Sequence, residues 1–359
     1  MNDILDIKGY EEYAKKKLPE NITAFFSRGA GDEITLEDNS SAFDRIKFLP
    51  RVLKNVEKRS LSTTLLKQVI DFPLVIAPMA FQKLAHSDGE IATAKAAKEH
   101  NIIMVVSTCS TCSFEEIKAH TSASPLFQLY IYKDREITKS LIQLAELSGF
   151  VGIVLTVDAP IYGKRVKEIH HPITLSPDFD IKNLQKAGLN LKDIPANELL
   201  DYISSLLDPT ISWNDIDWLR SITSLPIILK GIMNPKDIRI AIEHNVDAVV
   251  VSNHGGRQLD TTLSSVDALK LLRDTIDGNM EIILDGGIRK GIDILKALAL
   301  GAKAVMVGRP ILWGLSTNGE EGVKRVLNIL KSELDIAMAL CGYTSINQIS
   351  EEVLFFPSR

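Results

Sequence analysis

Eight short apolar runs recur along the chain, and each is followed by a polar or glycine-bearing segment and then by a stretch with helical periodicity. The runs lie at 73–78, 102–107, 126–130, 152–158, 226–231, 247–254, 281–287 and 303–309. Most are continuous rather than alternating in polarity, which is expected of parallel strands buried on both faces. The pattern therefore predicts repeated strand–helix units.

Helical patterns separate these runs, at 88–100, 113–120, 137–149, 235–245, 264–276 and 290–302. Asp88 and Ser113 stand where helices should begin, and Gly149 and Gly301 stand where helices should end. Eight such units favour a closed parallel barrel of the TIM (β/α)8 type. A doubly wound open sheet is the alternative.

Two segments fall outside the repeat. Residues 1–70 precede the first strand, and we expect them to form a helical extension outside the barrel. Residues 161–212 form a long insertion after the fourth strand, where a lid or substrate loop is expected. No linker composition marks a second domain, so 1–359 is predicted to be a single domain.

The composition excludes several classes of protein. The 359 residues are 45% hydrophobic with a formal net charge of −5, a balance that disfavours nucleic acid and anionic membrane surfaces as partners. No apolar run reaches transmembrane length. The odd number of cysteines, 3, and the polar start MNDILDIKGY favour a reducing compartment.

Polar side chains gather where the apolar runs end. In a barrel these positions share one rim, the usual place of the active site. A single serine or threonine there is more often a turn residue, so the signal is the number and common placement of the set. Its members are Ser107, Gln128, Tyr130, Thr156, Asp158, Lys230, Ser252, His254, Arg257, Asp285 and Arg309.

The last two strands predict a phosphate site. Asp285-Gly286-Gly287 and Gly308-Arg309 each lead into a helix, and Arg289 follows the first set. Glycines let backbone N–H groups approach an anion, and guanidinium groups add charge. The alternative is that these segments are tight turns whose arginines are solvated. Because two such sets occur in adjacent loops, phosphate binding is the favoured interpretation.

A base and two cations are predicted at the same rim. His254 and Arg257 lie in SNHGGRQLD, where two glycines permit a sharp turn that brings an imidazole and a guanidinium together. Asp158 can orient His254 from across the rim. Lys230 ends an apolar strand, which favours a functional cation over a lysine that merely extends to solvent.

Several longer motifs extend this picture, namely VVSNHGGRQLD (250–260), LDGGIRKGIDILKALALGAKAVMVGRP (284–310), FQLYIYKD (127–134), LTVDAP (155–160) and SITSLPIILKGI (221–232). Through them nearly the whole chain resembles the FMN-dependent 2-hydroxy acid oxidases, the group that contains glycolate oxidase and long-chain hydroxyacid oxidase. The resemblance implies oxidation of a 2-hydroxy acid by O2, with hydrogen peroxide as the second product.

The resemblance also implies roles for individual residues. His254 would be the base, steadied by Asp158. Arg257 and Arg165 would clamp the substrate carboxylate, Tyr130 would bind near its hydroxyl, and Lys230 would stabilise charge on the reduced flavin. No metal is implied. The residues implied to hold FMN are Pro78, Met79, Ala80, Ser107, Gln128, Thr156, Lys230, Ser252, Asp285, Gly286, Gly287, Arg289, Gly308 and Arg309.

Two positions depart from the short-chain members of that family. Phe25 stands where they carry a tyrosine that helps to hold the carboxylate, and Cys109 where they carry a pocket tryptophan. A lost hydrogen bond to a charged group costs roughly 1.5–3 kcal/mol, which weakens binding without removing the base or the flavin. We expect a preference for longer or bulkier acids, similar to the long-chain branch.

Other interpretations remain open. A dehydrogenase with another electron acceptor, a catalytically silent flavin protein and a non-redox phosphate-binding barrel are alternatives. Family members are commonly homotetramers or homo-octamers and often peroxisomal, with links to fatty acid metabolism, but the terminal Pro-Ser-Arg is a poor peroxisomal signal and the cytoplasm is the alternative. Cys109 and Cys112 are expected to line a pocket and begin a helix, and His170 and His171 to lie on the surface or lid.

Overall fold

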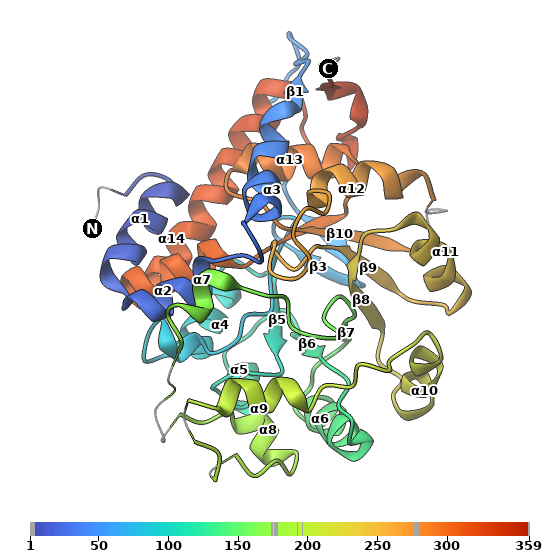
Figure 1. Cartoon of the computed structure of the whole chain (residues 1–359). Helices are drawn as coiled ribbons and strands as arrows, with labels where there is room; N and C mark the ends of the chain where they lie inside the picture. The colour runs from blue at the N-terminus through green and yellow to red at the C-terminus, as the bar shows by residue number, and fades with distance from the viewer. Residues whose placement is uncertain are drawn as a thin grey trace.

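The computed structural model describes residues 4–173, 175, 179–191, 193–195, 197–275 and 280–357. Its centre is a closed barrel of parallel strands in the order β10-β11-β4-β5-β6-β7-β8-β9 (Figure 1). Pairing of β11 with β4 closes the barrel, so the predicted TIM architecture is confirmed and the open sheet is excluded. The strands are β4 (Leu74–Ile76), β5 (Ile103–Ser107), β6 (Leu126–Leu129), β7 (Ile153–Thr156), β8 (Ile227–Ile232), β9 (Ala248–Val251), β10 (Glu281–Asp285) and β11 (Ala304–Val307).

Burial on both faces explains the continuous apolar runs. Every residue of β5, β6, β7, β9 and β11 is buried. Alternate side chains, such as Val105, Val154 and Val250, pack inside the barrel, whereas Val106, Leu155 and Val251 belong to the larger core beneath the helices. The two faces of each strand therefore enter two separate apolar clusters.

Helices follow the strands around the barrel: α4 (Gly89–Glu99), α5 (Phe114–Lys118), α6 (Arg135–Leu147), α10 (Asn214–Ile222), α11 (Pro235–Glu243), α12 (Ser265–Leu272), α13 (Gly291–Ala299) and α14 (Arg309–Cys341). Ser113 caps the start of α5, as predicted, and the structure adds that Glu116 completes a capping box with it. Asp134 caps α6, which therefore begins two residues before the predicted position. The helix α14, which bends at Asn318 and Gly319, was not predicted from the sequence.

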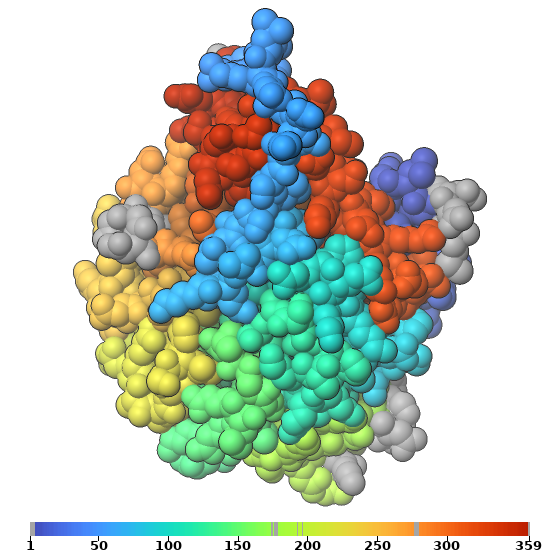
Figure 2. Space-filling model, turned by 180° about the vertical axis from the view of Figure 1, so that it is seen from behind, coloured from blue at the N-terminus to red at the C-terminus, as the bar shows by residue number. Residues whose placement is uncertain are grey.

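The N-terminal extension is only partly helical. It contains α1 (Ile7–Lys17), α2 (Glu20–Ser27) and α3 (Ile34–Arg45), and then β1 (Lys47–Phe48), which pairs with β12 (Leu354–Phe355). β2 (Thr63–Leu65) and β3 (Gln68–Ile70) form a hairpin whose Leu65 and Ile70 join the cluster inside the barrel. The prediction of helices up to residue 70 is therefore wrong for this hairpin, which covers the amino ends of the strands. Figure 2 shows the blue segment lying across this back face.

The insertion after β7 contains α7 (Val166–Ile169), α8 (Lys182–Lys186) and α9 (Leu199–Ser205). Arg135 on α6 holds its end through Asp208 at 2.7 Å and Asp215 at 2.8 Å. Short 3-10 turns η1 (Gln82–Leu84), η2 (Arg273–Thr275), η3 (Ile346–Gln348) and η4 (Glu351–Val353) complete the described elements. The assignment of the whole chain to one domain stays a prediction.

Candidate active site

A cavity of about 520 Å³ opens at the carboxyl ends of the barrel strands. It is lined by residues from the barrel, the N-terminal extension and the insertion. Almost all the residues singled out from the sequence line it. Those residues are Phe25, Pro78, Met79, Ala80, Ser107, Cys109, Gln128, Tyr130, Thr156, Arg165, Lys230, His254, Arg257, Asp285, Gly286, Gly287, Arg289, Gly308 and Arg309.

Three neighbouring strands place a row of neutral polar groups on the cavity wall. Ser107 donates to Oε1 of Gln128 at 3.3 Å, and Nε2 of Gln128 donates to Oγ1 of Thr156 at 3.1 Å. All three side chains are buried. Their amide and hydroxyl groups can hydrogen-bond the polar edge of a flat ring that lies against the wall.

Lys230 continues this row on β8. Its Nζ lies 3.1 Å from Oδ2 of Asp285 and donates to Oγ of Ser252 at 3.0 Å. Burial disfavours the ammonium ion, but the charges of Asp285 and Asp158 outweigh burial and raise the pKa of Lys230. The lysine therefore presents a permanent positive charge to the cavity, while Ser252 stands behind it and supports it.

His254 pairs with Asp158 across the rim. Nδ1 of the imidazole lies 2.8 Å from Oδ1 of the carboxylate. Burial lowers the pKa of His254, although Asp158 opposes this shift. Burial alone would raise the pKa of Asp158. The charge and hydrogen bond of His254, together with the charge of Lys230, outweigh burial and hold this pKa below its usual value. A neutral imidazole protonated on Nδ1 beside an ionised carboxylate leaves Nε2 free to accept a proton.

Gly231 makes room for this pair. It has a φ of +116°, and a Cβ there would lie 2.5 Å from Cβ of Asp158. The register between β8 and β9 shifts at this point, between Lys230 and Ile232. A side chain at position 231 would push Asp158 away from the imidazole.

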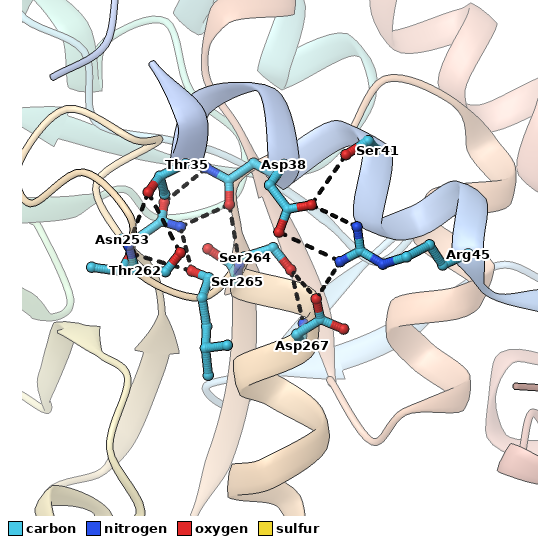
Figure 3. A network of polar contacts seen from close by, with 11 residues as sticks. Thr35, Asp38, Ser41, Arg45, Asn253, Thr262, Ser264, Ser265 and Asp267 are labelled. Atoms are coloured by element: carbon cyan, nitrogen blue, oxygen red, sulfur yellow. Dashed lines mark hydrogen bonds and ion pairs between the residues drawn. The ribbon is translucent and has the colours of Figure 1, made fainter. Parts of the chain in front are cut away.

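The loop that carries His254 is held from behind. His254 has a φ of +59°, a left-handed conformation that is unusual for a residue with a side chain. The preceding Asn253 exchanges two amide hydrogen bonds with Asn39 of α3, at 2.9 Å and 2.7 Å. Figure 3 shows Asn253 within the polar network that joins α3 to residues 262–267. The N-terminal extension therefore fixes the position of the predicted base.

Arg257 and Arg165 converge on the same end of the cavity. Nη1 of Arg257 donates to the carbonyl oxygens of Phe25 at 2.7 Å and Arg28 at 2.9 Å. Nε of Arg165 donates to the Arg257 carbonyl at 3.2 Å. Burial lowers the pKa of Arg257 to about 10, with Arg165 adding to the shift and Glu168 opposing it. Arg257 therefore remains charged at neutral pH, and the two guanidinium groups can bind a carboxylate.

The remaining predicted substrate contacts also lie here. Phe25 packs under Arg257, with the guanidinium carbon 5.4 Å from the ring centroid. Burial raises the pKa of Tyr130 well above its usual value, so its phenol stays a hydrogen-bond donor. Burial raises the pKa of the Cys109 thiol to about 12, which makes it an inert lining group.

The loops after β10 and β11 have the features of a phosphate site. Gly287 has a φ of +82°, and a Cβ there would lie 1.9 Å from the Asn39 carbonyl oxygen. Gly308 precedes the first turn of α14, whose N-terminus can attract an anion. The guanidinium of Arg309 donates to the carbonyl oxygens of Phe26, Gly255 and Arg28, so it also braces the His254 loop.

Several lining residues were not predicted from the sequence. The insertion supplies Tyr162, Glu168, Ile169, Ile173, Leu200 and Ile203, and α2 supplies Phe26. The only available signal was the length of the insertion at the catalytic rim. No periodicity relates its residues to the strand ends, because the contacts depend on how the loop folds back.

Other sequence features have no part in the cavity. Cys112 is fully buried next to the start of α5, His170 is exposed, and His171 lies 3.5 Å from Glu20. Within the described ranges no group of three or more histidine, cysteine or acidic residues is placed to hold a metal. Among those same ranges, no helix has both the length and the apolar composition to span a bilayer. Ser358 and Arg359, the end of the targeting signal considered above, lie outside the described residues.

The donor groups fit FMN. Closely packed glycines, a helix N-terminus and Arg289 suit a phosphate at one end. The Ser107–Gln128–Thr156 row and the buried Lys230 suit the polar edge of a ring system. The His254–Asp158 pair lies at the same rim.

This fold and this site define a flavin-dependent barrel oxidoreductase. Residues 14–355 match the family model described as FMN-dependent dehydrogenase, and the chain belongs to that family, whose cofactor is FMN. It is similar to a 2-hydroxyacid oxidase of Dictyostelium discoideum, with 44% identity over 99% of this chain and 91% of the relative. It is also similar to an L-lactate oxidase of a Nostoc strain, with 45% identity over 96% of each chain.

A solved structure gives the same result. A mutant of an active chimera of (S)-mandelate dehydrogenase has a TM-score of 0.91 and 33% identity. The match covers 99% of this chain and 100% of that one. The protein is therefore an FMN-dependent oxidoreductase with the barrel of this family.

Proposed function

We propose that the protein oxidises (S)-2-hydroxy acids to 2-oxo acids and passes the electrons to O2, which becomes hydrogen peroxide. The observation that carries the proposal is the His254–Asp158 pair at 2.8 Å, beside a cavity that also holds Lys230 and two arginines. Oxidation of a 2-hydroxy acid removes a proton and two electrons. It therefore requires a base for the proton, a cation near the group that receives the electrons, and a site that binds the substrate carboxylate.

Each residue then has a defined task. Arg257 and Arg165 bind the substrate carboxylate, and the Tyr130 phenol donates to an oxygen of the substrate. Nε2 of His254 accepts the proton, and Asp158 stabilises the imidazolium that results. FMN held in this cavity would supply the acceptor for the two electrons, and Lys230 would place positive charge beside its polar edge. The proposal includes FMN binding by the residues that the sequence predicts for it, from Pro78 to Arg309.

The proposed substrates are of medium or long chain. Ile169, Ile173, Leu200 and Ile203 line the cavity with apolar surface contributed by the insertion. Phe25 and Cys109 also line the cavity. Phe25 lacks the hydroxyl of the tyrosine, and Cys109 lacks the bulk of the tryptophan, that short-chain members carry at these positions. An apolar tail can bury its surface here at roughly 25 cal/mol per Å² removed from water.

Anaerobic bleaching of the flavin by a chain-length series of 2-hydroxy acids tests this function. We expect bleaching by the (S) acids and the highest kcat/KM for longer chains. A yellow protein that no acid bleaches would support a silent flavin protein, and a colourless one would support a non-redox barrel. The highest kcat/KM with glycolate would contradict the preference for longer chains.

A dehydrogenase is the second candidate, because the similar mandelate enzyme is called a dehydrogenase. The relatives named as oxidases support O2 as the acceptor. Peroxide formed per acid consumed under air separates the two: one equivalent supports the oxidase, and none supports another acceptor. A homotetrameric or homo-octameric assembly and a peroxisomal location, with the cytoplasm as alternative, complete the proposal.

A further inference from the structure

A carboxylate of the protein itself lies at the arginine pair. Glu168 is on α7, two residues after the helix begins, and its side chain is only 15% exposed. Oε2 lies 3.3 Å from Nη1 of Arg165, and Oε1 lies 3.4 Å from Nη2 of Arg257. One carboxylate thus bridges the two guanidinium groups to which the proposed function assigns the substrate carboxylate.

We propose that Glu168 is an internal competitor for the carboxylate clamp, and that its charge makes the clamp select acids with a single negative charge. This inference rests on the proposed function. In the free protein Glu168 contacts guanidinium groups of both arginines. A substrate carboxylate that binds has to displace Glu168 from these donors. Two arginines and one glutamate leave one net positive charge, which one carboxylate neutralises.

The arginines do not depend on Glu168 for their position. Two backbone carbonyl oxygens hold Nη1 of Arg257, and the Arg257 carbonyl holds Nε of Arg165. The guanidinium carbon of Arg165 also lies 5.1 Å from the Tyr162 ring centroid. Removal of the glutamate charge would therefore leave the clamp in place, with donors released for a ligand.

The contacts of Glu168 are longer than those of Arg135, which also lies between two carboxylates. Arg135 approaches its two aspartates at 2.7 Å and 2.8 Å, whereas the contacts of Glu168 are 3.3 Å and 3.4 Å. Charge-assisted hydrogen bonds of this type are usually about 2.7–2.9 Å. Glu168 therefore acts as a loosely held counter-ion of two buried arginines rather than as a tight bidentate partner. A better-placed carboxylate can replace Glu168 at these arginines.

The backbone of α7 is held separately. Lys167, the neighbour of Glu168, forms an ion pair with Glu33, which is buried in the N-terminal extension. Glu33 also accepts from the backbone N–H of Gly29 at 2.9 Å. This anchor keeps Glu168 near the arginines even when they release it, so its negative charge continues to disfavour a second carboxylate.

Anion titration of the oxidised holoenzyme, followed by the flavin absorbance, tests the inference without turnover. The probes are propionate, with one carboxylate, and malonate, with two. For Glu168→Gln we expect propionate to bind about tenfold more tightly, the scale of one partly screened charge interaction. Malonate should gain more than propionate. The KM for a 2-hydroxy acid should fall in step with the gain in propionate affinity.

Two control variants separate the clamp from general charge. Asp201→Asn removes a carboxylate that lines the same cavity and contacts no arginine among the described residues. Glu136→Gln removes an exposed charge paired with Lys139. Asp201→Asn should strengthen propionate binding less than Glu168→Gln does, because Asp201 is not paired with the clamp, and Glu136→Gln should leave the affinity unchanged. Glu168→Ala serves as a second test if Glu168→Gln is unstable, with the same direction expected.

Weaker or unchanged propionate binding in the Glu168 variants would overturn the inference, because Glu168 would then be a support for the arginines or irrelevant to them. Equal gains for propionate and malonate would overturn the selectivity. The outcome is distinguishable from failure of the proposed function: if wild-type protein oxidised no 2-hydroxy acid, the titration would still report competition at the arginine pair.

Discussion

Nδ1 of His254 lies 2.8 Å from Oδ1 of Asp158, although 96 residues separate the two in the chain. Asp158 follows β7 and His254 follows β9, with β8 between them. Burial lowers the pKa of the imidazole, and the Asp158 charge is the main force that opposes the shift. Two measurable consequences follow, one for the pH profile and one for the glycine beside the pair.

The pH dependence of kcat/KM should report His254. A base acts when neutral, so kcat/KM should fall as the pH drops through the His254 pKa, with a midpoint below the usual value of about 6.5. Asp158→Asn removes the charge that raises this pKa, so its midpoint should move to lower pH. Its maximal rate should also fall, because the imidazolium loses its partner.

Asp217→Asn is the matched control, since Asp217 lies 3.0 Å from Nδ1 of His244 and does not belong to the cavity lining. Its profile should coincide with that of the wild-type protein. A midpoint that rises in Asp158→Asn would contradict the assignment of His254 as the group observed.

Gly231→Ala should disrupt the same pair from the other side. The new Cβ would lie 2.5 Å from Cβ of Asp158, so the carboxylate has to move. We expect kcat/KM to fall by about 10²-fold or more, the scale of a misplaced catalytic group. FMN content should stay unchanged. Stopped-flow reduction of the flavin gives the rate.

Gly188→Ala controls for backbone strain. Gly188 has a φ of +104°, but no atom lies within 4 Å of a Cβ there. This variant should lose about 1–3 kcal/mol of stability through backbone strain and no activity. Equal activity of Gly231→Ala and Gly188→Ala would show that the contact with Asp158 is not needed for catalysis.

Lys230→Met should destabilise the protein even without cofactor. Lys230 and Asp285 are 6% and 12% exposed, and loss of the lysine leaves a buried carboxylate without its ion-pair partner. The expected loss in the free energy of unfolding is about 3 kcal/mol. Urea unfolding of the apoprotein measures it.

Lys182→Met is the comparison, because Lys182 and Glu116 form a more exposed pair. Its loss should stay below about 1 kcal/mol. If the two variants had the same stability, the buried pair would contribute no more than a surface pair.

The cavity residues Phe25 and Cys109 should set chain-length preference. Phe25→Tyr adds a hydroxyl near the arginine pair, and Cys109→Trp fills cavity volume beside it. The double variant should raise kcat/KM for glycolate by roughly tenfold, at the lower end of the roughly 1.5–3 kcal/mol of a hydrogen bond to a charged group. It should lower kcat/KM for long acids, because the indole occupies their space.

Steady-state kinetics over a chain-length series provides this measurement. Cys341→Ser is the cysteine control, since Cys341 ends α14 and does not line the cavity. A double variant that improved turnover of long acids would contradict the proposed part of Phe25 and Cys109 in specificity.

The sequence by itself determined the barrel and most of its rim. Strands buried on both faces need continuous apolar runs. The sequence of β5 or of β11 therefore predicts the strand without knowledge of what packs against it. Polar residues that follow parallel strands have to meet at one end of the barrel, which places Lys230, His254 and Asp285 together. Local chemistry also determined the capping box at Ser113.

Only the tertiary structure decided which distant segments complete the site. The carbonyl oxygens of Phe25 and Arg28 that hold Arg257 are backbone groups, which every residue type provides equally and no sequence pattern reveals. The position of Glu168 depends on an insertion that folds back without any periodic relation to the strands. Leu65 and Ile70 of the β2–β3 hairpin pack into the cluster inside the barrel, and this contact joins strands that are distant in the sequence, so no local pattern reveals it.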